Sequence, residues 1–341
     1  MKRLKKLPRD YRTLVFVILI LALLPFVYKP MRENPTSATF ILYWAFLGTA
    51  WNIMGGYAGQ FSFGHAAYFG LGAYASTVLF VDYGISPWIG MLVGAVLASL
   101  FALLTGYLSF RYGLKGPYFA LATFAFAEML RLVATEVEFI NTSIGITIPI
   151  NMEIGDSWSM LRFNNTPSNY YYAILALLTL GLLVTVMIRH SKLGYYYQAI
   201  REDEDAAAAL GVNLLRYKIS AVMISGALTA MGGGFFAHFF TFINPDLAFG
   251  VSVSIEILMR PIVGGTGTIW GPLIGALFLT PLGDATRTLI RTPPAFLSFI
   301  QGRAGVDEML FGVILILVIL FMPDGILGAG RRLWRRVRRS S

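Results

Sequence analysis

The chain has 341 residues, of which 56% are hydrophobic and 13% are charged, and its formal net charge at pH 7 is +9. Soluble domains devote about a quarter of their residues to charge, so this composition excludes an ordinary soluble protein and predicts a polytopic membrane protein. Cysteine is absent, which excludes disulfides, thiolate metal sites and a cysteine nucleophile.

The positive charge gathers at the two ends of the chain. The basic residues there are Lys2, Arg3, Lys5, Lys6, Arg9 and Arg12 before the first apolar segment, and Arg331, Arg332, Arg335, Arg336, Arg338 and Arg339 after the last. Beside hydrophobic segments, such clusters indicate retention on the cytoplasmic face rather than binding to nucleic acid. We therefore expect both termini to be cytoplasmic and the lipid bilayer, not nucleic acid, to be the surrounding partner.

Ten apolar segments follow one another along the chain, and a helix needs roughly 20 mainly apolar residues to span a bilayer. They cover residues 13–28, 38–54, 55–76, 85–109, 118–134, 170–188, 219–242, 251–263, 268–283 and 309–322. This pattern predicts a single all-α transmembrane domain over residues 1–341, with about ten transmembrane helices. Residues 135–169, which hold four acidic residues and one basic residue, are expected to form an extracytoplasmic loop, and residues 284–305 a second one.

Clustered glycines interrupt this pattern in two places. They begin at GGYAGQFSFGH after residue 54 and at GGTG after residue 263, and they are too dense for ordinary helix interiors. Helix breaks at membrane depth and close helix packing both explain such clusters. The short segments on either side of GGTG resemble the broken helices of transporters. The glycines concerned are Gly55, Gly56, Gly59, Gly64, Gly264, Gly265 and Gly267.

Two pairs of opposite charges lie inside apolar segments. Glu128 and Arg131 are three residues apart, and Glu256 and Arg260 are four apart, so each pair shares one helix face. Charges within membrane segments often mark transport pathways. A structural ion pair that joins helices is the alternative, because burying a pair is tolerable whereas burying one charge is not.

A polar stretch from residue 191 to residue 216 separates two apolar segments and carries Arg201 and Glu202 in a charged run. The run predicts a short helix outside the membrane, because acidic residues favour a helix N-terminus, a tract of alanines follows, and Gly211 provides a stop. With both termini inside, this stretch is cytosolic. A solvated connecting helix is the simplest interpretation of its composition.

The chemistry of enzymes is missing from the sequence. No GxxxxGK[ST] phosphate loop and no GxGxxG after a strand occurs, so no nucleotide site is predicted. The three histidines, His65, His190 and His238, are isolated from one another, which argues against a metal site. We therefore predict no catalytic residue, no metal and no cofactor bound by this chain.

Four stretches, in order, closely resemble the LivM-type permease subunits of branched-chain amino acid ATP-binding-cassette (ABC) importers. They are GQFSFGHAAYFGLGAYAS, LKGPYFALATFAFAEMLR, SKLGYYYQAIREDEDAAAALGVN and IVGGTGTIWGPLIGA, and the resemblance extends from about residue 38 to the Pro323-Asp324-Gly325 ending. Two places depart from the family pattern: the NTSIGITIP stretch from residue 141 and Arg260-Pro261 before the GGTG cluster.

The resemblance implies that residues 191–216 are the coupling loop, since Asp205, Ala206, Ala207 and Gly211 reproduce the spacing acid-Ala-Ala-three residues-Gly. It also implies a multi-pass protein of the bacterial or archaeal plasma (inner) membrane. The implied partners are a second, LivH-type permease, two cytosolic ATPases that bind ATP and Mg²⁺, and an extracytoplasmic substrate-binding protein.

Three alternatives to a branched-chain amino acid permease stay open, one of which is a purely structural membrane scaffold. Relatives of this kind of permease carry urea or short amides. A self-sufficient secondary transporter would instead use Glu128 and Glu256 as proton or ion sites.

Overall fold

The computed structural model describes residues 8–27, 35–137, 144–149, 156–163 and 166–291, together with 309, 312–313, 316, 320–322, 325–330 and 332. Half of the predicted last span, residues 309–322, and most of the basic termini lie outside these residues. The helices are α1 (Arg9–Val27), α3 (Thr36–Asn52), α4 (His65–Tyr83), α5 (Pro87–Arg111), α6 (Pro117–Glu136), α7 (Ser168–Arg189), α8 (Lys192–Glu202), α9 (Glu204–Ala209), α10 (Leu214–Phe240), α11 (Pro245–Phe249), α12 (Val251–Gly264) and α13 (Gly271–Arg291). A π-helical turn, η2 (Ile53–Tyr57), continues α3.

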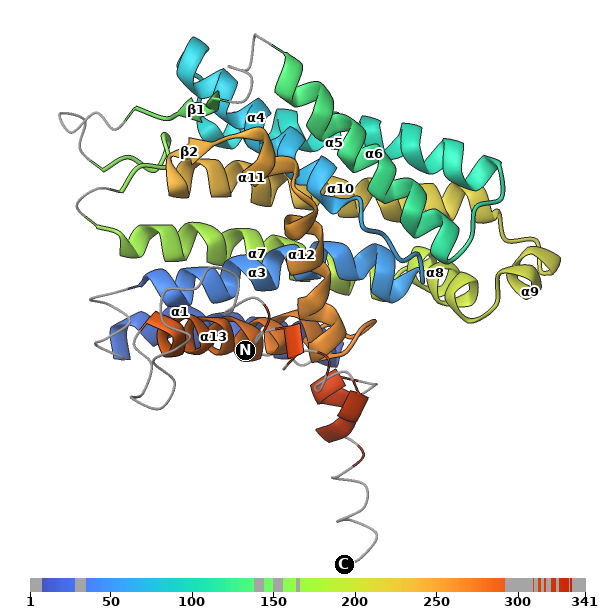
Figure 1. Ribbon diagram of the computed structural model, residues 1–341. Helices are drawn as coiled ribbons and strands as arrows, with labels where there is room; N and C mark the ends of the chain where they lie inside the picture. The colour runs from blue at the N-terminus through green and yellow to red at the C-terminus, as the bar shows by residue number, and fades with distance from the viewer. Residues whose placement is uncertain are drawn as a thin grey trace, which may run out of the picture.

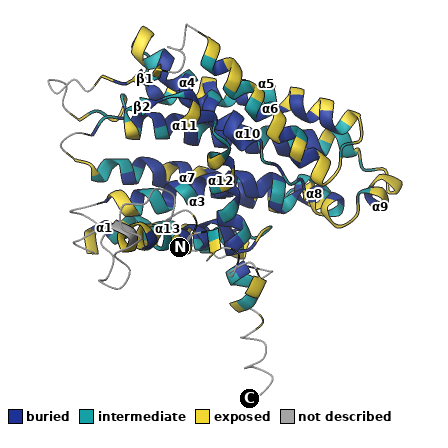
Figure 2. Cartoon of the chain, in the orientation of Figure 1, coloured by how far each residue is buried: buried dark blue, intermediate teal, exposed yellow. Residues whose placement is uncertain are grey.

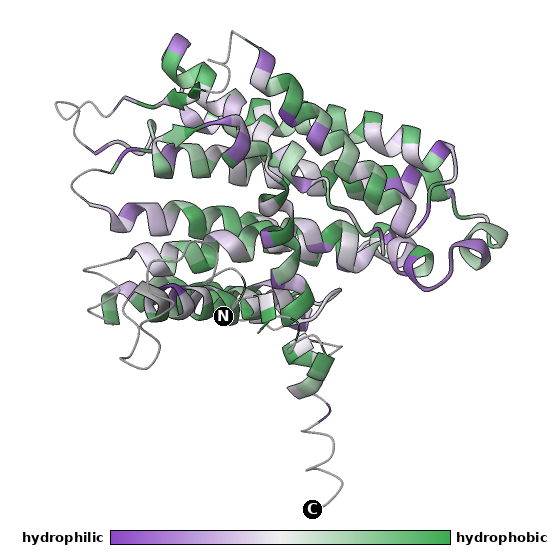
Figure 3. Cartoon of the chain, viewed as in Figure 1, coloured by the Kyte–Doolittle hydropathy of each residue, from purple (hydrophilic) through white to green (hydrophobic). Residues whose placement is uncertain are grey.

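Long apolar helices dominate the described part of the chain. Six helical stretches in it are long and apolar enough to cross a membrane: α1, α5, α6, α7, α10, and α11 with α12. Hydrophobic residues cover these helices, whereas hydrophilic residues gather toward the helix ends and loops (Figure 3). The prediction of an all-α polytopic membrane protein is confirmed, and α3, α4 and α13 lie at three further predicted segments.

The predicted loop from residue 284 is wrong at its start, because α13 continues as a helix to Arg291. Polarity suggested a loop there, but neither glycine nor proline occurs between Gly283 and Thr292. Nothing in the local sequence therefore stops the helix before Arg291.

Helix α10 lies in the middle of the bundle, packed against α4 and α5, while α3 packs against α7 and α13 (Figure 1). Small residues bring α4 and α10 together: a Cβ on Gly72 would lie 1.9 Å from the Ala230 carbonyl oxygen, and one on Gly233 would lie 2.0 Å from that of Phe69. Backbones approach this closely only where side chains are minimal. Larger residues at either glycine would separate the two helices.

The two ends of the bundle carry different structures (Figure 1). Helices α8 and α9 lie at one end, which we call the α9 end. At the opposite end, the β1 end, strand β1 (Ile146–Thr147) pairs in antiparallel fashion with β2 (Phe242–Ile243). The predicted extracytoplasmic loop, residues 135–169, contributes β1. This loop and the predicted cytosolic stretch, residues 191–216, therefore lie at opposite ends of the bundle.

Candidate functional site

The polar stretch at the α9 end forms two helices rather than the single helix predicted. Asp203 separates α8 from α9 with an extended backbone, and its side chain accepts hydrogen bonds from the backbone N–H groups of Asp205 and Ala206, both at 2.9 Å. This is an N-cap, which stabilises a new helix start. The acidic run therefore begins α9 at Glu204 and leaves Arg201 and Glu202 at the end of α8.

Helix α9 ends at the predicted glycine. Gly211 has a φ of +84°, its N–H donates to the Ala208 carbonyl, and the N–H of Val212 donates to the Ala207 carbonyl. These two bonds form a Schellman motif, which favours glycine because side chains strain the left-handed backbone. The stop predicted at Gly211 is confirmed.

Apart from Asp205, the exposed residues of α9, and Leu210, which directly follows it, are apolar. Leu210 is 84% exposed, and Ala206, Ala208 and Ala209 are also exposed, whereas Ala207 is only 2% exposed. Figure 2 shows exposed residues around α9. Ala207 therefore packs within the chain, and Leu210 with its three alanine neighbours is the part of α9 available to a partner.

Glu204 anchors α9 to the bundle. Its carboxylate forms an ion pair with the Lys218 ammonium on α10 and accepts a 3.1 Å hydrogen bond from the Gln60 amide, which lies between η2 and α4. The Lys218 side chain is only 5% exposed and its ammonium lies 5.1 Å from the centre of the Phe110 ring. A cation buried to this degree needs its carboxylate partner, so α9 is held to α10.

Lys115, in the turn between α5 and α6, makes an outer contact with the same helix. Its ammonium lies 3.0 Å from Asp205 and 3.6 Å from Glu204. The hydrogen bond to Asp205 raises the pKa of Lys115 above its ordinary value, so the lysine stays cationic throughout the physiological pH range. Helix α9 is thus connected to α10 and to the α5–α6 turn.

Arg201 connects α8 to the two glycine clusters. Its Nη1 donates a 2.7 Å hydrogen bond to the carbonyl oxygen of Gly56 in η2. A Cβ on Gly267 would lie 2.1 Å from the same Nη1, and Gly267 has a φ of +71°. The guanidinium therefore fits against both clusters, and a side chain at position 267 would have to displace it as well as adopt a backbone conformation that favours glycine.

Asn52 joins the two clusters directly. Its amide nitrogen donates to the Thr268 carbonyl at 2.9 Å, and its Oδ1 accepts from the Gly267 N–H at 2.8 Å. Asn52 is fully buried at the end of α3. The end of α3 is thus bonded to the irregular backbone between α12 and α13. We call Asn52, Gly56, Arg201 and Gly267 the junction.

The remaining predicted glycines combine breaks with close packing. Between α3 and α4 the chain forms η2 and an irregular stretch, and between α12 and α13 it is irregular from Gly265 to Trp270. A Cβ would lie 2.3 Å from Trp51 at Gly55, 3.1 Å from Arg201 at Gly59, 2.8 Å from the Thr123 carbonyl at Gly64, and 1.8 Å from the Gly271 carbonyl at Gly264. Gly265 has a φ of +127°. Interruptions of the helices and close packing therefore occur together at these glycines.

The pair on α6 forms a cluster toward the β1 end. Arg131 donates to Glu128 Oε2 at 3.0 Å and to Glu128 Oε1 at 2.6 Å, and to Asp246 of α11 at 2.7 Å. The predicted pairing on one helix face is present, with a third, acidic member from a helix 115 residues away. The cluster ties α6 to α11 and lies away from the junction.

The second pair is also formed. The Arg260 guanidinium bonds the Glu256 carboxylate one turn earlier on α12, and its Cζ lies 4.2 Å from the centre of the Trp44 ring on α3. Arg260 is 4% exposed. An arginine stacked on an aromatic face explains how a charged residue occupies a place where the sequence pattern favoured an apolar one.

Sequence reasoning missed three residues of the site. Asn52 appears at the end of an apolar segment, Gln60 within a glycine-rich run, and Lys218 at the start of a span, and no local pattern marks them. Among the residues that the structure describes, no group of three or more His, Asp or Glu is placed to hold a metal ion.

Comparisons with known proteins identify the relatives of this chain. A profile of the family described as "Branched-chain amino acid transport system / permease component" matches residues 36–319. The high-affinity branched-chain amino acid transport system permease protein LivM of Escherichia coli (strain K12) is 26% identical over 92% of this chain and 74% of its own length.

Two further relatives carry related descriptions. The permease protein BraD of Pseudomonas aeruginosa, from a high-affinity branched-chain amino acid transport system, is 24% identical over 89% of this chain and 98% of its own length. The permease protein LivH of Escherichia coli (strain K12) is 32% identical over 43% of each chain. No solved structure matches this chain.

Proposed function

The chain belongs to the family of branched-chain amino acid transport system permease components, and on that premise we propose that it is the membrane-spanning subunit of an ABC importer. The importer moves branched-chain or similar small amino acids into the cytoplasm across the bacterial or archaeal plasma membrane. The α8–α9 segment is its coupling loop. Leu210 and Ala206, exposed on α9, are positioned to contact an ATPase.

The observation that carries this proposal is the connection from α9 to the junction. Glu204 holds α9 to α10, and Arg201 holds the preceding helix to Gly56 and against Gly267. A displacement of α9 by ATPase closure therefore acts on the broken helices without an intervening flexible linker. Rigid elements with two packed arrangements are the physical means of such transmission.

The proposed assembly contains a second, LivH-type permease, two cytosolic ATPases and an extracytoplasmic substrate-binding protein. ATP and Mg²⁺ bind in the ATPases, and this chain performs no hydrolysis. A self-sufficient transporter would instead take up substrate without them. ATP-dependent uptake of leucine by the reconstituted complex, with urea as the alternative substrate, tests the proposal, and uptake that proceeds without the ATPases would contradict it.

We expect Leu210→Glu to weaken ATPase association by at least about tenfold, or 1.4 kcal/mol, because a charge placed in a small apolar contact stays unpaired when water is excluded. Copurification of the ATPases with the permease measures this. Ile144→Glu is the matched control, since Ile144 is 81% exposed and lies beside β1 at the opposite end. Equal copurification of both variants would show that α9 is not the docking element.

The proposed topology has ten crossings and both termini inside, with residues 191–216 cytosolic and 135–169 outside. Because the chain has no cysteine, single cysteines report each side. In right-side-out vesicles, a membrane-impermeant maleimide should label Ile144→Cys at once and Tyr112→Cys only after permeabilisation, since Tyr112 lies in the α5–α6 turn at the α9 end. The reverse order of labelling would invert the map.

A further inference from the structure

A cavity of about 640 Å³ lies between α3, α10, α12 and α13. This volume is in the range of pockets that hold small organic ligands. Aromatic, charged and hydroxyl-bearing side chains are among its lining residues. The cavity is separate from the junction, which contributes none of these residues.

Charges of both signs face this cavity in equal number. Glu256 and Arg260 come from α12, and Asp284 and Arg287 come from α13. Each helix thus contributes one acid and one arginine. The lining is therefore neutral overall while offering both a carboxylate and a guanidinium to a ligand.

Polar groups in and beside the cavity have unused bonding capacity. Both hydrogen bonds that Arg260 donates within the described residues come from Nη1, and its buried Nε has no partner. The hydroxyl of Thr280, which lines the cavity, is also buried without one. Buried polar groups are rarely left unpaired, so these positions point to a polar ligand.

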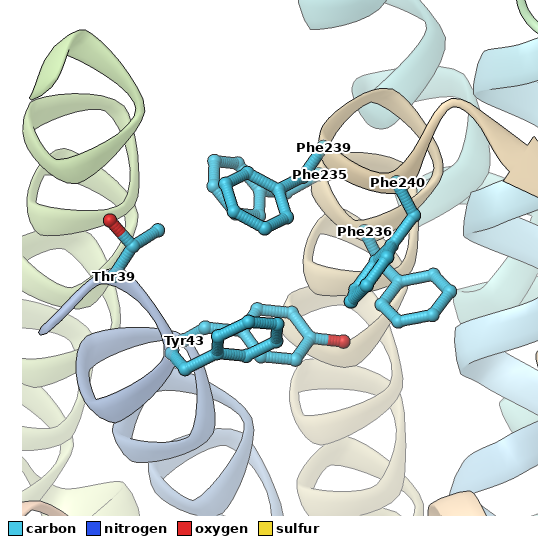
Figure 4. A pocket seen from close by; sticks show the side chains of 7 residues that line it. Thr39, Tyr43, Phe235, Phe236, Phe239 and Phe240 are labelled. Carbon is cyan, nitrogen blue, oxygen red and sulfur yellow. The ribbon is translucent and has the colours of Figure 1, made fainter. Parts of the chain in front are cut away.

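An apolar wall completes the cavity. Phe40, Phe236 and Phe240 line it and also belong to a cluster of rings between α3 and α10, which Figure 4 shows with Tyr43 facing the phenylalanines of α10. The hollow within that cluster is too tight to hold a water molecule. The rings therefore present a closed aromatic surface on one side of a charged cavity.

We propose that this cavity is a binding site for a zwitterionic α-amino acid with an apolar side chain, occupied on the way through the membrane. The α-carboxylate meets the arginine guanidinium groups, the α-ammonium meets Glu256 and Asp284, and the side chain lies against the phenylalanines. This assignment rests on the proposed importer function and narrows it, because urea and short amides carry neither charge.

The test measures binding of tritiated leucine to the purified permease–ATPase complex by scintillation proximity, without ATP and without the binding protein. Asp284→Asn and Arg287→Gln are each expected to weaken leucine binding by about tenfold or more. These rim positions are chosen because changing Glu256 alone would strand the buried Arg260. Leu277→Ala, half exposed on α13 and outside the cavity, should leave binding unchanged.

Two analogues test the charge assignment. 4-Methylpentanoate lacks the ammonium, and isopentylamine lacks the carboxylate, so each should compete at least about tenfold less well than leucine. Urea should not compete. The double variant with Glu256→Gln and Arg260→Met, which leaves no stranded charge, should assemble normally yet lose leucine binding.

Unchanged leucine affinity in Asp284→Asn, Arg287→Gln and the double variant would overturn the proposal, as would absence of binding in a complex that takes up leucine with ATP. The Glu256–Arg260 ion pair would then be structural. Failure of the importer function would give a different result, namely no ATP-driven uptake by the parent complex. Leucine binding is measured without ATP and does not depend on that uptake.

Discussion

Replacing Gly267 with alanine is expected to abolish ATP-driven uptake while leaving the chain inserted in the membrane. The new Cβ would lie 2.1 Å from Arg201 Nη1 and 2.9 Å from the Gly56 carbonyl oxygen, so it displaces the guanidinium and breaks the 2.7 Å hydrogen bond between them. The φ of +71° adds about 1–2 kcal/mol of strain for any residue with a side chain. Uptake by the reconstituted complex is the measurement.

Gly113→Ala is the control that separates strain from crowding. Gly113 has a φ of +73°, nearly the same as Gly267, but a Cβ there would have nothing within 4 Å. It lies in the α5–α6 turn at the same end of the bundle. Both variants therefore carry the backbone penalty, and only Gly267→Ala should lose uptake. Equal loss in the two would show that backbone strain, and not crowding at the junction, causes the loss of uptake.

Lys218→Met is expected to lower the free energy of unfolding by about 3 kcal/mol, because it leaves the Glu204 carboxylate without its buried partner. Glu204 is 19% exposed and keeps Gln60 as a donor, so we place the effect at the lower end of the range for such pairs. Thermal unfolding of the detergent-solubilised complex measures it. ATPase copurification should fall as well, because α9 then loses its anchor on α10.

Two further variants make this prediction specific. Lys115→Met removes an ammonium that is 53% exposed, so it should destabilise the protein much less than Lys218→Met does. The double variant with Glu204→Gln and Lys218→Met removes both members of the buried pair and should recover at least half of the loss. A double variant as unstable as Lys218→Met would show that the lysine acts through packing on Phe110 rather than through its charge.

The helical membrane architecture could be predicted because hydropathy and helix length are local properties. The α9 stop at Gly211 was equally local, since the alanine tract and the glycine adjoin each other. The split between α8 and α9 was missed because Asp203 can serve either inside an acidic first turn or as a cap, and the sequence alone does not choose between them. Likewise, polarity after Gly283 suggested a loop where helix propensity prevailed.

The junction and the cavity could not be predicted, because their members are far apart in the chain. Arg201 meets Gly56 across 145 residues, and Asn52 meets Thr268 across 216. Each residue has an unremarkable neighbourhood, and only packing of the bundle brings them together. Glu256 and Arg260 were recognisable as a pair from their spacing, but the facing charges of α13 depend on how two helices align.

The two lysines that hold α9 differ in how far their side chains are exposed to the ions of the solvent. Lys115 and Asp205 have side chains that are 53% and 88% exposed, whereas the Lys218 side chain is 5% exposed. At physiological ionic strength, mobile ions screen exposed charges over about 8 Å but act much less on buried pairs. Rising salt therefore weakens the contact of α9 with the α5–α6 turn and leaves its contact with α10 in place, so α9 stays attached to the bundle through Glu204.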